Sequence, residues 1–298
     1  MGIRKRLANR FEDFYRKRLS ITKDNWRSYV RITPFVGDVL LGNFSHPVFG
    51  RFLRRLYKFE GENHHAGSVT VPINQDLNFV SSRKSMVIPV EKVRQLIKEA
   101  SYRVILHRCI CRDGYGCTNF PRDFACIMVG EACRVMVAHG IAREVTEEEA
   151  MTHLDKAIKL GLICNIAWTE FESIAKGIPK EDRMKYVEIC LCCPCCCLGL
   201  RNFKHWYKTE SLRKQITSTG WKARGTEECT GCGTCTTVCY MEAITVGEDG
   251  ISVNDDYCVG CGLCASHCPN QAIVMEEIVP TKEHLLDYFT YFRPQISG

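Results

Sequence analysis

The stretch Cys229–Ile244, CTGCGTCTTVCYMEAI, returns with substitutions as Cys258–Ile273, CVGCGLCASHCPNQAI. The offset of 29 residues (258 − 229) holds for all four cysteines of each copy and for the Ala-Ile pair that ends it. Each copy has the spacing C-x2-C-x2-C-x3-C, followed by a short apolar segment typical of a strand. Such an internal repeat predicts a small unit of two similar halves related by a pseudo-two-fold axis.

This spacing suits the ligation of [4Fe-4S] clusters. Two-residue gaps form a tight turn with three sulfurs pointing inward, and the intervening glycines let backbone N–H groups approach cluster sulfur. The fourth cysteine of each copy is expected to bind the cluster of the other copy. The predicted ligands are Cys229, Cys232, Cys235 and Cys268 for cluster I, and Cys258, Cys261, Cys264 and Cys239 for cluster II.

Zinc is the main alternative for these eight cysteines. A zinc ribbon uses four ligands in two C-x2-C pairs, which fits two runs of three cysteines plus one poorly. Residues 222–277 resemble the bacterial-type ferredoxins with two [4Fe-4S] clusters, which implies a ferredoxin-like fold and single-electron transfer. That family has proline after the fourth cysteine; here Pro269 follows Cys268, but Tyr240 follows Cys239. We expect the extra N–H and ring of Tyr240 to shift the potential of cluster II.

The composition places the other cysteines in a reducing environment. The chain has 298 residues, 45% of them hydrophobic, enough for two modest domains, and a net charge of +6. Its first residues lack the apolar run of a secretion signal, and no run approaches the roughly 18 apolar residues of a membrane span. We therefore expect a cytoplasmic protein, in which 20 cysteines indicate metal or redox chemistry.

Twelve cysteines remain outside the repeat (20 − 8), all between residues 109 and 197. Adjacent cysteines rarely form disulfides with each other because the ring is strained. Two isolated cysteines, Cys133 and Cys164, are expected to be small buried hydrophobic residues. The candidate ligands of one or two further clusters, [4Fe-4S] or of unusual type, are Cys109, Cys111, Cys117, Cys126, Cys190, Cys192, Cys193, Cys195, Cys196 and Cys197.

A broader resemblance covers residues 86–278. The segments 109–112 (CICR), 116–117 (GC) and 189–197 (ICLCCPCCC), with the ferredoxin segment after them, are similar to the cysteine-rich "4Fe-4S ferredoxin" proteins common in anaerobes. This resemblance implies metal binding and electron transfer.

Local patterns predict several elements around these cysteines. Pro89 opens a helix with Val90, Val93 and Ile97 on one face, and residues 102–106 form a short strand. The apolar stretch 124–138 is expected to be helical, and a capping box of Thr146 and Glu149 starts a helix that stops at Gly161. The predicted fold class is α+β, with a mainly helical cysteine-rich domain (61–215), a ferredoxin-like dicluster domain (220–278) and a tail (279–298) that reaches a partner.

Residues 1–60 form a basic amphipathic segment. They hold fourteen Lys or Arg and five Asp or Glu, and Ile3, Leu7 and Phe11 fall on one helical face, as do Phe49 and Leu53 farther on. Three interpretations stay open: docking on the chain's own core, attachment to the anionic inner face of a membrane, or docking to an acidic partner. No nucleic-acid-binding motif accompanies the charge.

These patterns predict an iron–sulfur electron-transfer protein, or the electron-transfer subunit of a larger redox complex with a redox protein as its partner. Single electrons would pass through the two ferredoxin clusters and the further clusters of the cysteine-rich domain. The alternative is a reductase, an oxidoreductase whose catalytic cluster or thiol site in that domain is supplied with electrons by the ferredoxin clusters. The sequence assigns no catalytic residue.

Overall fold

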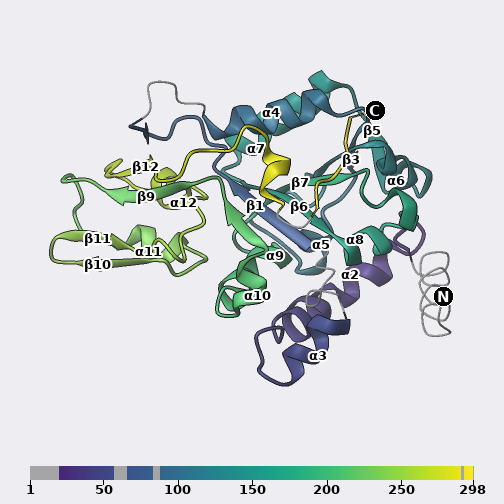
Figure 1. The fold of residues 1–298 in the computed structure, drawn as a ribbon, viewed down its shortest axis with the longest axis horizontal. Helices are drawn as coiled ribbons and strands as arrows, with labels where there is room; N and C mark the ends of the chain where they lie inside the picture. Colours follow the sequence, from purple (N-terminus) through teal and green to yellow (C-terminus); the bar gives the residue numbers. More distant parts are fainter. Residues whose placement is uncertain (1–19, 57–65, 83–87, 290–291, 298) are drawn as a thin grey trace.

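The computed structural model describes residues 20–56, 66–82, 88–289 and 292–297. The predicted amphipathic helix around Ile3, Leu7 and Phe11 lies outside these residues. The described part of the basic segment contains α2 (Trp26–Pro34), a π-helix (Phe35–Leu41) and α3 (Phe49–Leu56), and α2 and α3 lie together below the sheet in the view of Figure 1.

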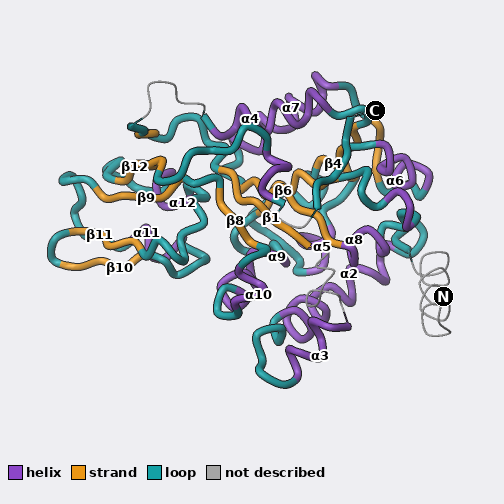
Figure 2. The backbone as a smooth tube through the Cα atoms, in the orientation of Figure 1, coloured by secondary structure: helices purple, strands orange, loops and turns teal. Residues whose placement is uncertain are grey.

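A seven-stranded sheet organises the cysteine-rich half, which we call the sheet domain (Figures 1 and 2). Its neighbouring strands are antiparallel except for the parallel pair at one edge. In spatial order the strands are β5 (Ala142–Glu144), β3 (Arg103–Leu106), β4 (Ile127–Val129), β7 (Val187–Cys192), β6 (Ile163–Thr169), β1 (Ala66–Val71) and β8 (Ile216–Ser218). Mixed helix and strand content agrees with the predicted α+β class, whereas the sequence did not predict the seven-stranded sheet that the helices of this domain surround.

The largest local error concerns residues 124–138. Instead of one helix, this segment forms β4, a 3-10 turn (Glu131–Cys133) and the short helix α6 (Arg134–Ala138). Gly130, with φ of 107°, ends the strand in a conformation that other residues rarely adopt. The apolar run of β4 is buried because β3 and β7 flank it on both sides, not because it lies on a helix.

Two predicted helices are confirmed, and they cover one side of the sheet (Figure 1). In α4 (Pro89–Glu99), Val90, Val93 and Ile97 are buried. Helix α7 (Glu147–Lys159) begins at the complete capping box of Thr146 and Glu149. The remaining helices are shorter: α5 (Ile110–Gly114), α8 (Glu170–Ala175), a 3-10 turn (Lys180–Asp182), α9 (Leu198–Trp206) and α10 (Glu210–Arg213).

The repeat region forms a separate lobe, which we call the dicluster half (Figure 1). It contains the hairpin of β10 (Ile244–Gly247) and β11 (Gly250–Val253), and the helices α11 (Thr234–Val238) and α12 (Leu263–Ser266). A three-stranded sheet joins β9 (Trp221–Gly225) to β12 (Ile273–Glu277), and β12 pairs on its other side with β2 (Phe79–Val80). Strand β2 precedes helix α4 of the sheet domain in sequence, yet it completes a sheet of the dicluster half.

The segment after β12 returns to the sheet domain. Its 3-10 helix η4 (Leu285–Tyr288) lies in the main hydrophobic core, with Leu285 1% and Leu286 3% exposed. Phe289 and Ile296 are buried there as well. The described part of the predicted tail therefore packs on the chain's own core. None of the described helices is long and apolar enough to cross a membrane.

Candidate metal-binding centres

The dicluster half contains two hollows lined by cysteine. One, of ≈ 320 Å³ including the solvent space at its mouth, is lined by Cys229, Cys232, Cys235 and Cys268. The other, of ≈ 350 Å³, is lined by Cys239, Cys258, Cys261 and Cys264. Each hollow takes three thiols from one copy of the repeat and the fourth from the other copy. The structure thus brings together the two sets of four that the sequence predicts as clusters I and II.

The backbone around the hollows suits bound sulfur. Gly233 and Gly262 begin α11 and α12 in the left-handed conformation, with φ of 77° and 82°. The N–H groups of Ala243 and Ala272 point at the fourth cysteines, with N···Sγ distances of 3.4 Å to Cys239 and 3.3 Å to Cys268. Donors at equivalent places in the two copies stabilise thiolate charge. Four thiols around a hollow lined mainly by apolar groups fit a [4Fe-4S] cluster.

The two hollows differ in exposure. Cys232 of the first is exposed, whereas Cys258 and Cys264 of the second are buried. Burial raises the pKa of the Cys261 thiol to about 12. A centre in the first hollow would lie near the surface, and one in the second would lie toward the sheet domain.

The ten candidate cysteines of the sheet domain separate into two groups. The first, the four-thiol group, has its Sγ atoms all within 4.8 Å of one another and consists of Cys117, Cys193, Cys195 and Cys196. In a tetrahedral site with metal–sulfur bonds of ~2.3 Å, the sulfurs lie about 3.8 Å apart, so this group is compact enough to hold metal.

The remaining six form what we call the six-thiol ring, in which each thiol contacts two others. Cys109 contacts Cys111 and Cys126, and Cys192 contacts Cys190 and Cys197. Contacts between Cys111 and Cys197 and between Cys126 and Cys190 close the ring. The Sγ atoms of Cys192 and Cys197 are 3.1 Å apart. Hydrogen bonds from the Cys111 and Cys126 thiols hold the pKa of Cys109 well below its usual range.

Secondary structure assigns each cysteine to its group. Cys190 and Cys192 lie two residues apart on β7 and therefore share one face of the sheet. Cys193 follows the strand and joins the four-thiol group, whereas Cys197 precedes α9 and returns to the six-thiol ring. The stretch from Cys190 to Cys197 thus supplies thiols to both groups in turn.

Arg112 lies between the two groups. Its side chain is fully buried, its Nε is 3.5 Å from the Sγ of Cys193, and its Nη2 donates to the carbonyl of Leu191. Burial lowers the pKa of Arg112, but the charges of the Cys109 and Cys193 thiolates outweigh it and raise the pKa. A guanidinium here stabilises negative charge on both groups.

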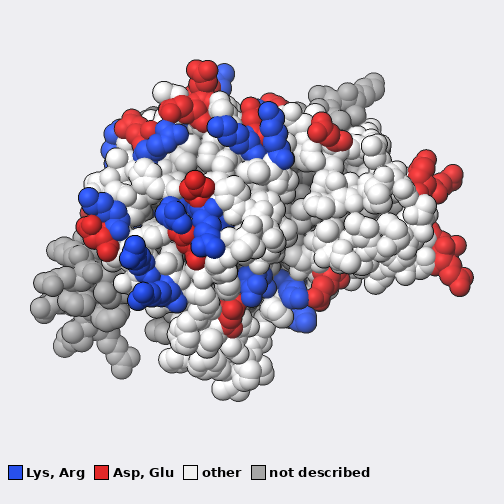
Figure 3. All heavy atoms as spheres, turned by 180° about the vertical axis from the view of Figure 1, so that it is seen from behind, with Lys and Arg blue, Asp and Glu red and all other residues white. Residues whose placement is uncertain are grey.

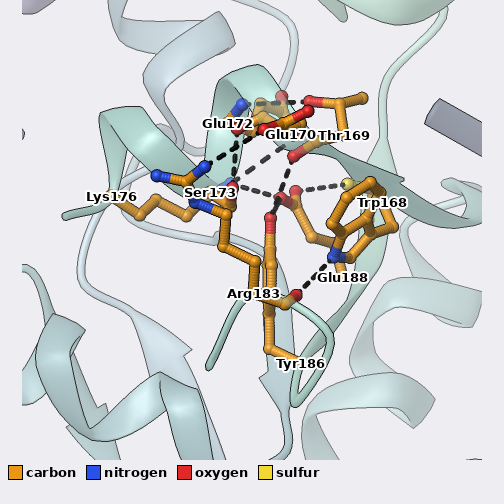
Figure 4. A network of polar contacts seen from close by, with 10 residues as sticks. Trp168, Thr169, Glu170, Glu172, Ser173, Lys176, Arg183, Tyr186 and Glu188 are labelled. Atoms are coloured by element: carbon orange, nitrogen blue, oxygen red, sulfur yellow. Dashed lines mark hydrogen bonds and ion pairs between the residues drawn. The ribbon is translucent and has the colours of Figure 1, made fainter. Parts of the chain in front are cut away.

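A buried charge network adjoins the six-thiol ring (Figure 4). The Cys190 thiol donates to Glu188 over 3.5 Å, and Glu188 forms an ion pair with Lys176. Burial raises the pKa of Glu188 to about 8, an effect that Glu172 increases and Lys176 opposes. The sequence analysis missed these residues, although Glu188 stands out as a charge in an apolar strand segment two residues before Cys190.

The two isolated cysteines occupy the hydrophobic core. Cys133 and Cys164 are both 0% exposed, and neither belongs to the four-thiol group or the six-thiol ring. Cys164 faces Leu191 across β6 and β7, on the face of the sheet opposite to that of Cys190.

Comparison with known proteins agrees with the geometry of the dicluster half. No curated protein and no solved structure matches the chain. Residues 228–272 match the family model described as a 4Fe-4S dicluster domain, so this part of the cysteine-rich chain is similar to domains that carry iron–sulfur clusters and transfer electrons.

Proposed function

We propose that the protein transfers single electrons through two [4Fe-4S] clusters in the dicluster half and further metal centres in the sheet domain, as a subunit or partner of a larger redox assembly. The observation that carries this proposal is the pair of hollows, each lined by three cysteines of one repeat copy and one of the other. When bound there, such clusters exchange one electron at a time. The cysteines ligate them, and the Ala243 and Ala272 N–H groups stabilise their charge.

The sheet domain adjoins the second hollow at Tyr240. This half-buried side chain lies near thiols of both parts, Cys239 and Cys261 of the second hollow and Cys192 of the six-thiol ring. Burial, followed by the charges of Cys261 and Cys192, raises its pKa well above the usual value. This contact supports an electron path that continues from cluster II into the six-thiol ring.

Burial of the sheet-domain thiols favours electron transfer over the alternative of a reductase. Six of the ten candidate thiols of the sheet domain are buried and the other four are half-buried. A substrate has to touch the metal or thiol that reduces it, whereas an electron does not. The motif resemblance to the cysteine-rich proteins of anaerobes also supports electron transfer.

The partner surface is proposed at two places. Acidic side chains gather at the outer edge of the dicluster half (Figure 3), where Glu248 and Asp249 are exposed at the tip of the β10–β11 hairpin. This edge suits a basic redox protein. In the segment around α2 and α3, Phe35, Val48 and Phe52 are 56%, 78% and 61% exposed, which suits an apolar partner or an anionic membrane surface. A flotation assay with anionic vesicles at low salt distinguishes a membrane surface from an apolar protein partner. The protein floats with the vesicles only if it binds the membrane.

The experiment that tests the function is an iron and sulfide count on protein purified without oxygen, followed by EPR spectroscopy after reduction. The dicluster half alone accounts for about eight irons, and centres in the sheet domain add to this number. We expect reduction to give signals that interact magnetically and that Cys232→Ser and Cys261→Ser alter separately. Colourless protein with zinc in place of iron would overturn the proposal.

A further inference from the structure

The six-thiol ring has the shape of a site rather than of a chance cluster of small side chains. Its members come from the turn before α5, from α5 itself, from the residue before β4, from β7 and from the start of α9. Three stretches of the chain, residues 109–111, Cys126 and residues 190–197, therefore bring their thiols together. Unlike Cys133 and Cys164, which belong to neither group of thiols, each member has thiols on both sides.

An unpartnered donor faces the ring. Asn165 lies directly opposite Cys190 in the β6–β7 pair, so the two side chains share one face of the sheet. Its Oδ1 accepts from Thr70 over 2.8 Å, but its Nδ2 has no hydrogen-bond partner among the described residues. Asn165 is 2% exposed, and leaving such a donor unpaired costs ~1–3 kcal/mol. A thiolate or sulfide at the centre of the ring would supply the missing acceptor.

A buried cation points the same way. Arg112 is buried, and no carboxylate of the described residues pairs with it; its contacts are carbonyl oxygens and the Cys193 thiol. A buried cation needs negative charge nearby. Metal-bound thiolates on either side of Arg112 would provide that charge.

We propose that the six-thiol ring is a metal site of its own, separate from the four-thiol group, and that it holds a polynuclear thiolate-bound centre. A tetrahedral metal ion takes four ligands, so six converging thiolates call for at least two metal atoms. The inference rests on the proposed function only in treating the sheet-domain thiols as metal ligands. Asn165 donates to sulfur of this centre, and Arg112 lies between it and the four-thiol group.

Two double variants within one stretch of sequence test this. Cys190→Ser/Cys192→Ser removes two thiols from the ring, and Cys195→Ser/Cys196→Ser removes two from the four-thiol group. Cys133→Ser/Cys164→Ser, which removes two buried thiols outside both, is the matched control. Iron, zinc and sulfide are counted in each protein purified without oxygen, and Mössbauer spectra are recorded on ⁵⁷Fe-loaded samples.

We expect the ring variant to lose at least two metal atoms per chain, because fewer than six ligands remain for a centre that uses them. The second variant should lose different metal, and a quadruple variant should lose the sum. The control should lose none. About eight irons retained in every variant show that the dicluster half is folded and loaded, which keeps this test distinct from that of the proposed function.

Three results would overturn the inference: no metal lost from the ring variant, a single metal atom lost from it, or the same metal and the same Mössbauer component lost from both double variants. The last result would mean that one centre spans all ten thiols.

If a ring variant also loses iron from the dicluster half, Asn165→Leu is tested in its place. This substitution removes the unpartnered donor and keeps all thiols. It should shift the reduction potential of one sheet-domain centre only; no shift would contradict the proposal.

Discussion

At the scale of single residues, the surroundings of each cysteine decide its chemistry. Burial raises the pKa of both Cys133 and Cys164 far above the usual value, so both thiols stay protonated. The thiolate is the form that binds metal. In the six-thiol ring the thiols hydrogen-bond to one another, which lowers the pKa of Cys109 and Cys197 and raises that of Cys111 and Cys126. The same side chain thus serves as a hydrophobic residue in one place and as a candidate ligand in another.

Cys164→Ala tests this distinction. The substitution removes one buried sulfur from a packed strand, and we expect it to lower the free energy of unfolding by about 1 kcal/mol, as for the loss of one buried methylene-sized group. Metal content should equal that of the native protein. Thermal unfolding and an iron count check both. A loss of metal on this substitution would show that Cys164 is a ligand.

The sequence predicts which cysteines are candidates better than it predicts how they group. The repeat spacing predicts the ligand sets of the dicluster half because, in each set of four cysteines, three are close together in sequence. In residues 190–197 the cysteines are equally dense. Which of them belong to the four-thiol group and which to the six-thiol ring depends on β7 ending at Cys192 and on α9 beginning after Cys197. The partner thiols, Cys109 and Cys117 among them, lie some seventy to ninety residues away in sequence, and only the fold shows which of them meets which group.

At the scale of elements, the periodic helices and the short strand at residues 102–106, which is β3, were predicted, but β4 was not. Helices α4 and α7 have apolar faces and clear start signals, which are local. The three residues of β4 hold no such signal, because a short apolar run fits a buried helix as well as a central strand. Strand pairing with β3 and β7 decides the outcome, and those partners are distant in sequence.

Helix α7 also makes the protein sensitive to acid. Its His153 stacks on Phe124, with ring centroids 4.0 Å apart, and its Nε2 lies 2.8 Å from the carbonyl oxygen of Ala125, as a donor. Burial lowers the pKa of His153 below its ordinary 6.5. The folded state therefore binds a proton less readily than the unfolded chain. This contribution to stability is complete above pH 6.5 and is lost as the pH falls through the lower pKa of the folded state.

Replacing His153 by Gln, which keeps a donor for the Ala125 carbonyl, should remove this dependence. We compare the thermal midpoint of the native protein with that of His153→Gln. The native protein should have the higher midpoint, and the difference should be larger at pH 7.5 than at pH 5.5. Thr152→Ala, at the exposed neighbouring position on α7, is the control and should give one constant difference. A difference between native protein and His153→Gln that stays equal at both pH values would contradict this account.

At the scale of the whole molecule, the two parts are interlocked. Strand β2 precedes the sheet domain's first helix yet pairs with β12 of the dicluster half, and the segment after β12 returns to the core of the sheet domain. The boundaries expected at residues 61, 215 and 278 follow composition along the chain, and composition does not reveal such exchanges. The arrangement places the second hollow against Tyr240 and the six-thiol ring, which a flexible linker would not do.

The returning segment should therefore contribute to the stability of the sheet domain. Leu285 is 1% exposed in the main core, and Leu285→Ala is expected to cost about 2–5 kcal/mol, which is ~5–15 °C in thermal midpoint for a protein of this size. Val279, in the same segment, is 59% exposed, so Val279→Ala should change the midpoint by little. Both are measured by circular dichroism on iron-loaded protein. Equal midpoints for the two variants would mean that the segment does not dock on the core, and that a partner surface at the C-terminal end is the better explanation for its apolar residues.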